Sequence, residues 1–380
     1  MVKAFIMRFV SLGVMLCASA GRAAVTPNAF TDGSDSDRIE AAIAKAAETG
    51  ERSIEIPRMN AKSGQPVWLI DRAILLPSDF TLVLRDCLVR LAPGTQDNII
   101  RNAGATLGPT AADRNIRVHG IGNAVLSGGL KPHFNPPGDK SGWRTIGVLL
   151  CNVKGFTLDG FTLEETQAWG ISVENGCARG RISNIAFNST NKMPNQDGVD
   201  VRKGCHDILI ENITGVCGDD VVALTGLRSH TPRPNGALSM QVGGDAPTDS
   251  DDIYNITIRN VQATCAGGHG IIRLLNQDGI RMYNIIMRDI IDTSAAGEKR
   301  VYSAVRIGDR NYSSIRRAEP GEMFNVVVDT VLTRGQAGVR IDGPLNDSAI
   351  RNIFGFDGCT NVVQTNAPVK NVTVENAKKK

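Results

Sequence analysis

The sequence predicts an all-β fold: a single-stranded right-handed parallel β-helix with a short N-terminal capping helix. Short runs of β-forming residues, broken by Gly, Asn and Asp, recur from about residue 51 onward. Steps of the form X-Gly-aliphatic open such runs at Trp169, Asp197, His269 and Ala337. The first two steps lie 28 residues apart and the last two 68 apart, or two coils of 34. Periods of this length indicate a stacked array.

A second set of strands follows the same period, and each begins with a polar residue, as in Asp207–Ile213, Asn255–Val261, Asn325–Val328 and Asn371–Val374. Coils of this kind bury their inward aliphatic residues on the neighbouring coils. The matching Asn positions predict inward or turn amides that hydrogen-bond along the stack.

A helix is expected over Asp37–Thr49, with Asp35 or Ser36 as its N-cap. Its apolar residues recur at helical spacing: Ile39, Ala42, Ile43 and Ala46. We expect this helix to cover the open edge of the first coil.

Residues 1–23 have the composition of a secretory signal peptide, with Lys3 and Arg8 before an apolar run and small residues after it. We therefore expect residues 24–380 to form one domain, in a secreted or periplasmic protein. No segment is apolar enough over sufficient length for stable membrane insertion. A net charge of +3 gives no reason to expect nucleic acid as a partner.

The chain has eight cysteines, and Cys17 lies in the expected signal peptide. Seven is an odd number, so complete internal pairing is excluded, and no Cys-x-x-Cys metal motif occurs. We expect most of the seven to be buried small residues. Two loops, near residues 131–144 and 229–252, interrupt the period and are expected to flank a binding groove. The oligomeric state is not indicated.

Stacking of the X residues about 4.8 Å apart would bring Trp169, Asp197, Asp219, Asp220 and His269 into one groove. Cleavage of a glycosidic bond needs one carboxylic acid that protonates the leaving oxygen and a second carboxylate. We expect carboxylates on neighbouring coils to approach the wide separation that accompanies inversion of the anomeric centre. Two adjacent acids also repel each other, which raises the pKa of one of them, as a general acid requires.

Four motifs occur in the order of the signature motifs of polygalacturonases, family 28 of the glycoside hydrolases: Asn195-Gln196-Asp197, Gly218-Asp219-Asp220, Gly268-His269-Gly270 and Arg306-Ile307-Gly308. The sequence resembles this family over most of its mature length. The resemblance implies that the protein hydrolyses a pectic polysaccharide or oligosaccharide with inversion of configuration at the anomeric carbon. It implies no metal or other cofactor.

The resemblance also implies a role for each residue. Asp219 would be the general acid, Asp197 and Asp220 would hold and activate water, and His269 would support the protonation of the acid. Asn195 and Arg306 would contact sugar. Two departures stand out: Gln196 replaces a threonine, and Gly308 replaces a lysine that serves a uronate carboxylate in the family. Three arginines are candidates to replace that cation, namely Arg310, Arg273 and Arg340.

Each residue also has a structural interpretation. Asp-Gly steps favour turns, and Asn276–Gly279, which repeats the Asn195 tetrapeptide, is interpreted as one. Trp169 is either a platform for a sugar ring or a packed ring at the edge of a coil. Asp200 is either a substrate contact or a solvated strand residue, and His269 could be structural.

Two other functions are compatible with the sequence. A polysaccharide lyase on the same fold would use the aspartates to hold Ca²⁺. A non-catalytic β-helix would only bind glycans.

Overall fold

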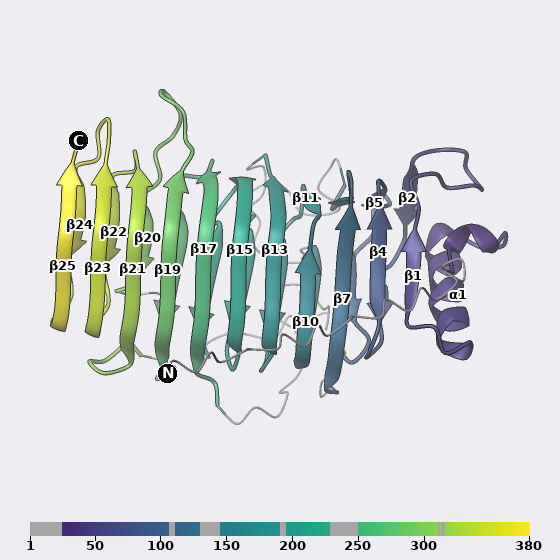
Figure 1. The fold of residues 1–380 in the computed structure, drawn as a ribbon, viewed down its shortest axis with the longest axis horizontal. Helices are drawn as coiled ribbons and strands as arrows, with labels where there is room; N and C mark the ends of the chain where they lie inside the picture. The colour runs from purple at the N-terminus through teal and green to yellow at the C-terminus, as the bar shows by residue number, and fades with distance from the viewer. Residues whose placement is uncertain are drawn as a thin grey trace, which may run out of the picture.

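The computed structural model describes residues 25–105, 111–129, 145–190, 195–228, 250–310, 312 and 316–380. In this part of the chain the backbone winds between two sheets, one of 15 strands and one of 10. Neighbouring strands in both sheets are parallel, and Figure 1 shows the coils stacked along one axis. The prediction of a right-handed parallel β-helix is confirmed.

The 15-stranded sheet consists of β1 (Ser53–Ile56), β2 (Val67–Ile70), β4 (Thr81–Arg85), β5 (Leu88–Leu91), β7 (Asp113–Ile121), β8 (Val125–Ser127), β10 (Val153–Asp159), β11 (Thr162–Glu164), β13 (Ala178–Asn188), β15 (His206–Cys217), β17 (Ile253–Cys265), β19 (Met282–Asp292), β21 (Met323–Thr333), β23 (Leu345–Gly355) and β25 (Val369–Lys379). The 10-stranded sheet consists of β3 (Ile74–Leu76), β6 (Ile100–Asn102), β9 (Val148–Cys151), β12 (Ile171–Glu174), β14 (Val199–Arg202), β16 (Val222–Gly226), β18 (Gly270–Asn276), β20 (Ser303–Ile307), β22 (Ala337–Ile341) and β24 (Asn361–Thr365).

The core fills the space between the two sheets, and it is built from identical positions on successive coils. Ile210 of β15 is in register with Ile258 of β17, which is in register with Met287 of β19. All three side chains are fully buried. Burial of an aliphatic side chain of this size contributes about 1.5–3 kcal/mol, so each added coil stabilises the one before it.

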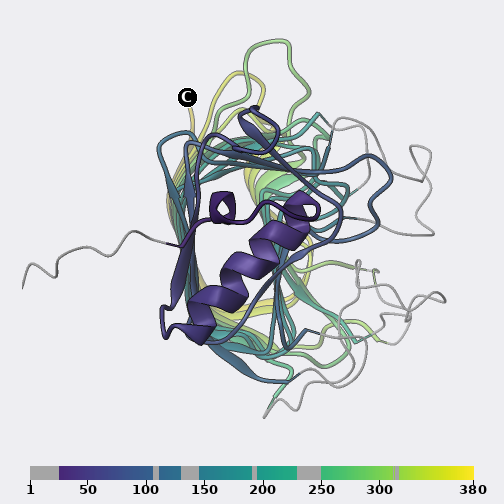
Figure 2. The same ribbon diagram turned by 90° about the vertical axis from the view of Figure 1, so that its right-hand side faces the viewer.

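The helix α1 (Asp35–Glu48), preceded by the 3₁₀ turn η1 (Pro27–Ala29), lies across the first coil, as Figure 2 shows. It contacts β1, β2 and β3, so the predicted covering of the open edge is confirmed. The four predicted apolar residues are buried. The predicted N-cap was wrong.

The helix begins earlier than expected because Ser34 and Asp37 form a capping box. The Asp37 N–H donates to Ser34 Oγ at 3.3 Å, and the Ser34 N–H donates to Asp37 Oδ2 at 2.6 Å.

The predicted amide bonding along the stack is present both at the corners of the coils and inside, where the buried Asn102 side chain bonds the backbone of Cys151. Asn212 Nδ2 donates to Asn184 Oδ1 at 2.9 Å, and Asn260 Nδ2 donates to Asn212 Oδ1 at 2.8 Å. All three residues have φ between 51° and 56°, a conformation that Asn tolerates better than most residues. This ladder fixes the corner of each coil against the next.

Several predictions concern residues that the structure does not describe. The signal peptide lies outside the described residues, as do the loop at 131–144 and nearly all of the loop at 229–252. The seven cysteines expected in the mature chain are buried and free. Among the described residues, no helix is long and apolar enough to cross a membrane.

Four stacked rings follow one corner of the large sheet: His206, Tyr254, Tyr283 and Phe324. Their centroids lie 4.7, 5.0 and 5.0 Å apart and their planes are within 3°. Tyr283→Ala removes two stacked contacts of about 0.5–1.5 kcal/mol each, together with ring area. We expect this substitution to lower the free energy of unfolding by roughly 2 kcal/mol, measured by chemical denaturation. Tyr283→Phe keeps the ring and should change stability by less than about 0.5 kcal/mol; equal losses in both variants would contradict a role for stacking.

Candidate active site

The register of the small sheet decides which side chains meet in the predicted groove. Ile171 of β12 is in register with Val199 of β14, and Val199 with Val222 of β16. Two residues before each of these positions are Trp169, Asp197 and Asp220, which therefore form one column, as predicted.

His269 is not in that column. Val222 is in register with Ile272 of β18, and the Val221 N–H donates to the Gly270 carbonyl at 3.3 Å. This places Gly270 beside Asp220 and His269 beside Asp219. The predicted phase of His269 was therefore wrong by one residue. Ile272 is in register with Val222, whereas the predicted His-Gly-Ile step required Ile271 at that position. The shift brings the imidazole to Asp219.

The turn before β14 supports the turn that carries the adjacent acids. The Gln196 carbonyl accepts from the Gly218 N–H at 2.9 Å and the Asp219 N–H at 3.1 Å. The Gln196 side chain is buried, and its Nε2 donates to the Thr166 carbonyl at 2.9 Å. The departure from threonine at this position thus adds an inward link from the turn to the preceding coil.

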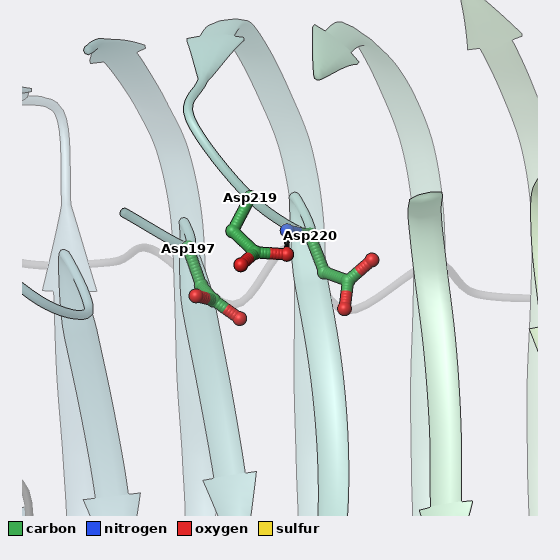
Figure 3. Close-up of side chains that lie close together, drawn as sticks. All are labelled: Asp197, Asp219 and Asp220. Atoms are coloured by element: carbon green, nitrogen blue, oxygen red, sulfur yellow. Dashed lines mark hydrogen bonds between the residues drawn. The ribbon is translucent and has the colours of Figure 1, made fainter. Parts of the chain in front are cut away.

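Figure 3 shows the carboxylates of Asp197, Asp219 and Asp220 gathered side by side at the start of neighbouring strands. One oxygen from each lies within 4.8 Å of the others. The wide gap expected between carboxylates on neighbouring coils is therefore absent at these oxygens. His269 Nδ1 lies 3.4 Å from Asp219 Oδ1, and the His269 N–H donates to Cys265 Sγ at 3.2 Å.

The three carboxylates differ in accessibility. The side chain of Asp219 is 15% exposed, whereas Asp197 and Asp220 are buried. The imidazole of His269 is 55% exposed. Asp219 and His269 therefore form the part of the cluster that solvent and a bound molecule reach most easily.

The cluster opens into a cavity that includes most of the predicted site residues. Its lining is Trp169, Asn195, Asp197, Asp200, Arg202, Asp219, Asp220, Ala223, Thr225, Leu227, Arg273, Leu275 and Tyr312. The structure thus brings together Trp169, Asn195, Asp200 and the three clustered aspartates. Arg306 is not part of this lining.

Trp169 and Asp200 lie in environments that the sequence did not reveal. The Trp169 ring is 4% exposed, packs in an apolar cluster with Ile146 and Leu149, and has the Arg202 guanidinium 4.3 Å from its centroid. Asp200 is 1% exposed, so it is not a solvated strand residue. Asn276 ends β18, and the rest of the tetrapeptide forms a turn closed by the Ile280 N–H, which donates to the Gln277 carbonyl at 3.1 Å, so the turn interpretation holds for Gln277–Gly279.

Burial dominates the electrostatics of the cavity. It raises the pKa of Asp220 to about 6, an effect that the Arg273 guanidinium opposes. Burial, followed by the charge of Asp200, raises the pKa of Asp197 well above its usual value. Burial likewise raises the pKa of Asp200, against the charge of Arg202. Among the described residues, Asp197 Oδ1 and Asp200 Oδ2 are buried and have no hydrogen-bond partner, so both present unsatisfied oxygens.

Three arginines lie in register on the outward face of the small sheet: Arg273, Arg306 and Arg340. The predicted common phase of the last two is confirmed. Arg306 is held by Asp342, with Nε 3.0 Å from Oδ2, and by Asp309, with Nη2 3.2 Å from Oδ1. Its guanidinium is therefore neutralised beside the cavity.

The lysine expected at position 308 could not be accommodated by this backbone. Gly308 has φ of 77°, a conformation that favours glycine. A Cβ atom there would lie 2.4 Å from Cα and N of Gly343. The missing cation is thus a property of the backbone after β20, and any positive group in the cavity has to come from another strand.

The three clustered carboxylates are the group that could hold a metal ion among the described residues. Ca²⁺ prefers six to eight oxygen ligands. Here the Arg273 guanidinium lies 3.5 Å from Asp220 and the imidazole 3.4 Å from Asp219. Basic groups at these positions compete with a cation, so the donor set fits a metal poorly.

Sequence reasoning missed two contributors to the cavity and undervalued a third. Arg202 follows Asp200 by two residues, so strand alternation already placed both on one face. The sequence indicates Arg273 only as a substitute for the absent lysine, whereas the register aligns it with Ala223 of the lining. Tyr312 follows β20 in a segment without periodicity, and no sequence signal identifies it.

Comparison with known families gives a direct match to part of the chain. Residues 144–273 match the family described as glycosyl hydrolases family 28. This region contains the three clustered aspartates and His269. No curated protein matches the sequence.

Solved structures share the fold over nearly the whole chain. An exopolygalacturonase from Thermotoga maritima is 15% identical with a TM-score of 0.54, covering 93% of this chain and 92% of that one. A polygalacturonase from Erwinia carotovora ssp. carotovora is 16% identical with a TM-score of 0.54, covering 92% and 95%. An endo-xylogalacturonan hydrolase from Aspergillus tubingensis is 14% identical with a TM-score of 0.55, covering 94% of both chains.

At these identities the solved structures show the fold, and the family match adds the region that carries the acids. Residues 144–273 are thus similar to family 28 of the glycosyl hydrolases, and the chain as a whole shares the fold of the solved polygalacturonases.

Proposed function

We propose that this protein is an exported glycoside hydrolase that cleaves glycosidic bonds in a pectin-like polysaccharide or oligosaccharide. The observation that carries the proposal is the cluster of Asp197, Asp219 and Asp220, with one oxygen of each within 4.8 Å of the others, opening into a lined cavity. Two of the similar structures are polygalacturonases and a third is a xylogalacturonan hydrolase, which supports a pectic substrate.

Asp219 is the proposed general acid, because it is the most accessible of the three acids and is the one beside His269. Its proton passes to the leaving glycosidic oxygen as the bond to the anomeric carbon breaks. Asp197 and Asp220 hold a water, whose oxygen bonds to the anomeric carbon while its proton passes to a carboxylate. The exposed imidazole of His269 supports return of a proton to Asp219 after each turnover.

Inversion is proposed from the family resemblance and not from the separation of the acids. In general, carboxyl groups about 6.5–9.5 Å apart accompany inversion and groups about 5–5.5 Å apart accompany retention. The close oxygens here are nearer to the second class. Inversion is compatible with this geometry if Asp197 and Asp220 hold the water between them. The water then lies beside Asp219 and not across a wide gap from it.

Asn195, Trp169 and Asp200 are proposed to contact the sugar, since all three line the cavity. The covered ring of Trp169 presents little area for stacking unless Arg202 moves. Contact between Arg306 and sugar remains a prediction, because Asp309 and Asp342 already engage its guanidinium.

Replacement of the acid tests the proposal. Asp219→Asn should lower the release of reducing ends from a panel of pectic oligosaccharides by about 100-fold or more, because unassisted departure of the sugar oxygen is slow. Activity on an aryl glycoside with a good leaving group should fall much less, since that group needs no proton. NMR of the first product anomer distinguishes inversion from retention.

Asp289→Asn, an exposed aspartate on β19, is the matched control and should keep full activity. Full activity of Asp219→Asn on natural oligosaccharides would place the acid elsewhere. Products that absorb in the ultraviolet, formed in a reaction stopped by chelator, would identify a lyase instead. No cleavage of any glycan would favour a binding protein.

The pH profile should report Asp220. A carboxylate that takes a proton from water acts only when ionised, and the pKa of Asp220 is raised to about 6. We expect kcat/KM to fall as the pH drops through about 6, up to tenfold per pH unit for one group. A profile that stays flat down to pH 4.5 would show that this carboxyl is not the base.

Gly270 provides space for the Asp220 carboxylate. A Cβ at Gly270 would lie 2.9 Å from Asp220 Oδ1, so Gly270→Ala should displace the carboxylate and lower kcat by about tenfold or more. Ser303→Ala is the control, because Ser303 is in register with Gly270 and its buried Oγ makes no hydrogen bond. Activity and melting temperature are measured for both; unchanged activity of Gly270→Ala would contradict the required position of Asp220.

A further inference from the structure

Arg273 lies on β18 at the point where the arginine column reaches the cavity. It is in register with Ala223 on the cavity side and with Arg306 on the other. Ala223 is small, so the longer side chain of Arg273 has room to extend toward the acids. Its side chain is 16% exposed and lines the cavity.

The Arg273 guanidinium joins two carboxylates. Its Nη1 lies 3.5 Å from Asp220 Oδ2, and its Nη2 donates to Asp309 Oδ2 at 2.5 Å. The Tyr312 ring covers it at 4.9 Å. A planar guanidinium can span two acceptors at once, which a lysine ammonium does less well. Arg273 therefore links Asp220 in the cavity to Asp309 in the segment after β20.

Asp309 is itself fixed by the next coil. Its Oδ1 lies 3.2 Å from Arg306 Nη2, and Arg306 Nε lies 3.0 Å from Asp342 Oδ2. Asp220, Arg273, Asp309, Arg306 and Asp342 therefore form a chain of alternating charge that runs from the acid cluster along the outer face of the sheet. The end that touches the reaction is Asp220.

The charged neighbours of Asp220 are mostly acidic. Asp197 and Asp200 face it from the β14 side, and Asp219 precedes it in the chain. The basic groups are His269 and Arg273 from the β18 side. The thiols of Cys217 and Cys265 lie behind the turns. Of these groups only the guanidinium carries a permanent positive charge.

We propose that Arg273 is a positioning residue for hydrolysis: it fixes the Asp220 carboxylate toward the water by tying it to Asp309. This inference rests on the proposed function of Asp220. Both terminal nitrogens of Arg273 already face carboxylates, so its role is to hold the catalytic acid and not to bind an acidic group of the substrate.

The test compares Arg273→Gln and Arg273→Lys with wild type on the best pectic oligosaccharide. In the glutamine variant kcat should fall roughly 10- to 100-fold, with KM changed less than about threefold. The acidic limb of the pH profile should move to higher pH, because removal of a nearby cation raises the pKa of a carboxyl group. The lysine variant should partly restore both kcat and the position of the limb. Asp309→Asn, which loosens the anchor only, should give a smaller change in the same direction.

Arg340→Gln is the matched control. Arg340 belongs to the same column, pairs with Asp342 and packs over Tyr302 at 4.3 Å, but does not line the cavity. It should retain wild-type kcat and the wild-type pH profile. If Arg340→Gln loses as much kcat as Arg273→Gln, the role of Arg273 is structural and the inference is overturned. A rise in KM at unchanged kcat in Arg273→Gln would also overturn it, because that result marks a residue that binds substrate.

Wild type and Asp219→Asn are assayed alongside these variants. If wild type hydrolyses the substrate, Asp219→Asn is inactive and Arg273→Gln behaves as wild type, the inference on Arg273 fails while the proposed function stands. If wild type releases no reducing ends from any glycan, the proposed function fails, and the inference fails with it.

Discussion

The register between successive coils is the constraint on which the rest of this structure depends. Parallel strands in a β-helix repeat their inward and outward positions, and a shift of one residue moves every side chain of a strand to the opposite face. The buried aliphatic column through Ile210, Ile258 and Met287 fixes that register. The same register, propagated through the small sheet, brings Asp197 and Asp220 together from turns 23 residues apart. The core thus brings together the turns that carry the acids, and local contacts such as that of Arg273 with Asp220 then orient the carboxylates.

A register that brings acids together also brings their negative charges together, and two features of the cavity reduce the resulting repulsion. Burial keeps the pKa of Asp197 and Asp200 high, so charge is withheld from the deepest positions. Arg202 of β14 and Arg273 of β18 line the cavity from the strands on either side of β16. A buried polar oxygen without a partner costs stability, and within the described part of the chain Asp197 and Asp200 each keep one such oxygen in the cavity.

The fold could be predicted from the sequence because its signals are repeated: each coil supplies the same turn residues and the same alternation. The identity of the clustered acids followed from the same repeat. The place of His269 did not, since Ile272 and not Ile271 is in register with Val222, which moves the histidine one residue out of the column. The capping box at Ser34 and the neutralisation of Arg306 by Asp309 and Asp342 involve specific side-chain partners, and no period encodes those.

The absence of a lysine at position 308 illustrates how backbone conformation limits side-chain chemistry. With φ at 77° and Gly343 within 2.4 Å of any Cβ, the chain turns tightly after β20 and holds Asp309 where it meets both Arg273 and Arg306. A side chain at 308 would displace this turn and with it the carboxylate that anchors both arginines. The same turn therefore has two effects on the charge of the cavity. It excludes a lysine at position 308, and through Asp309 it holds the Arg273 guanidinium beside Asp220.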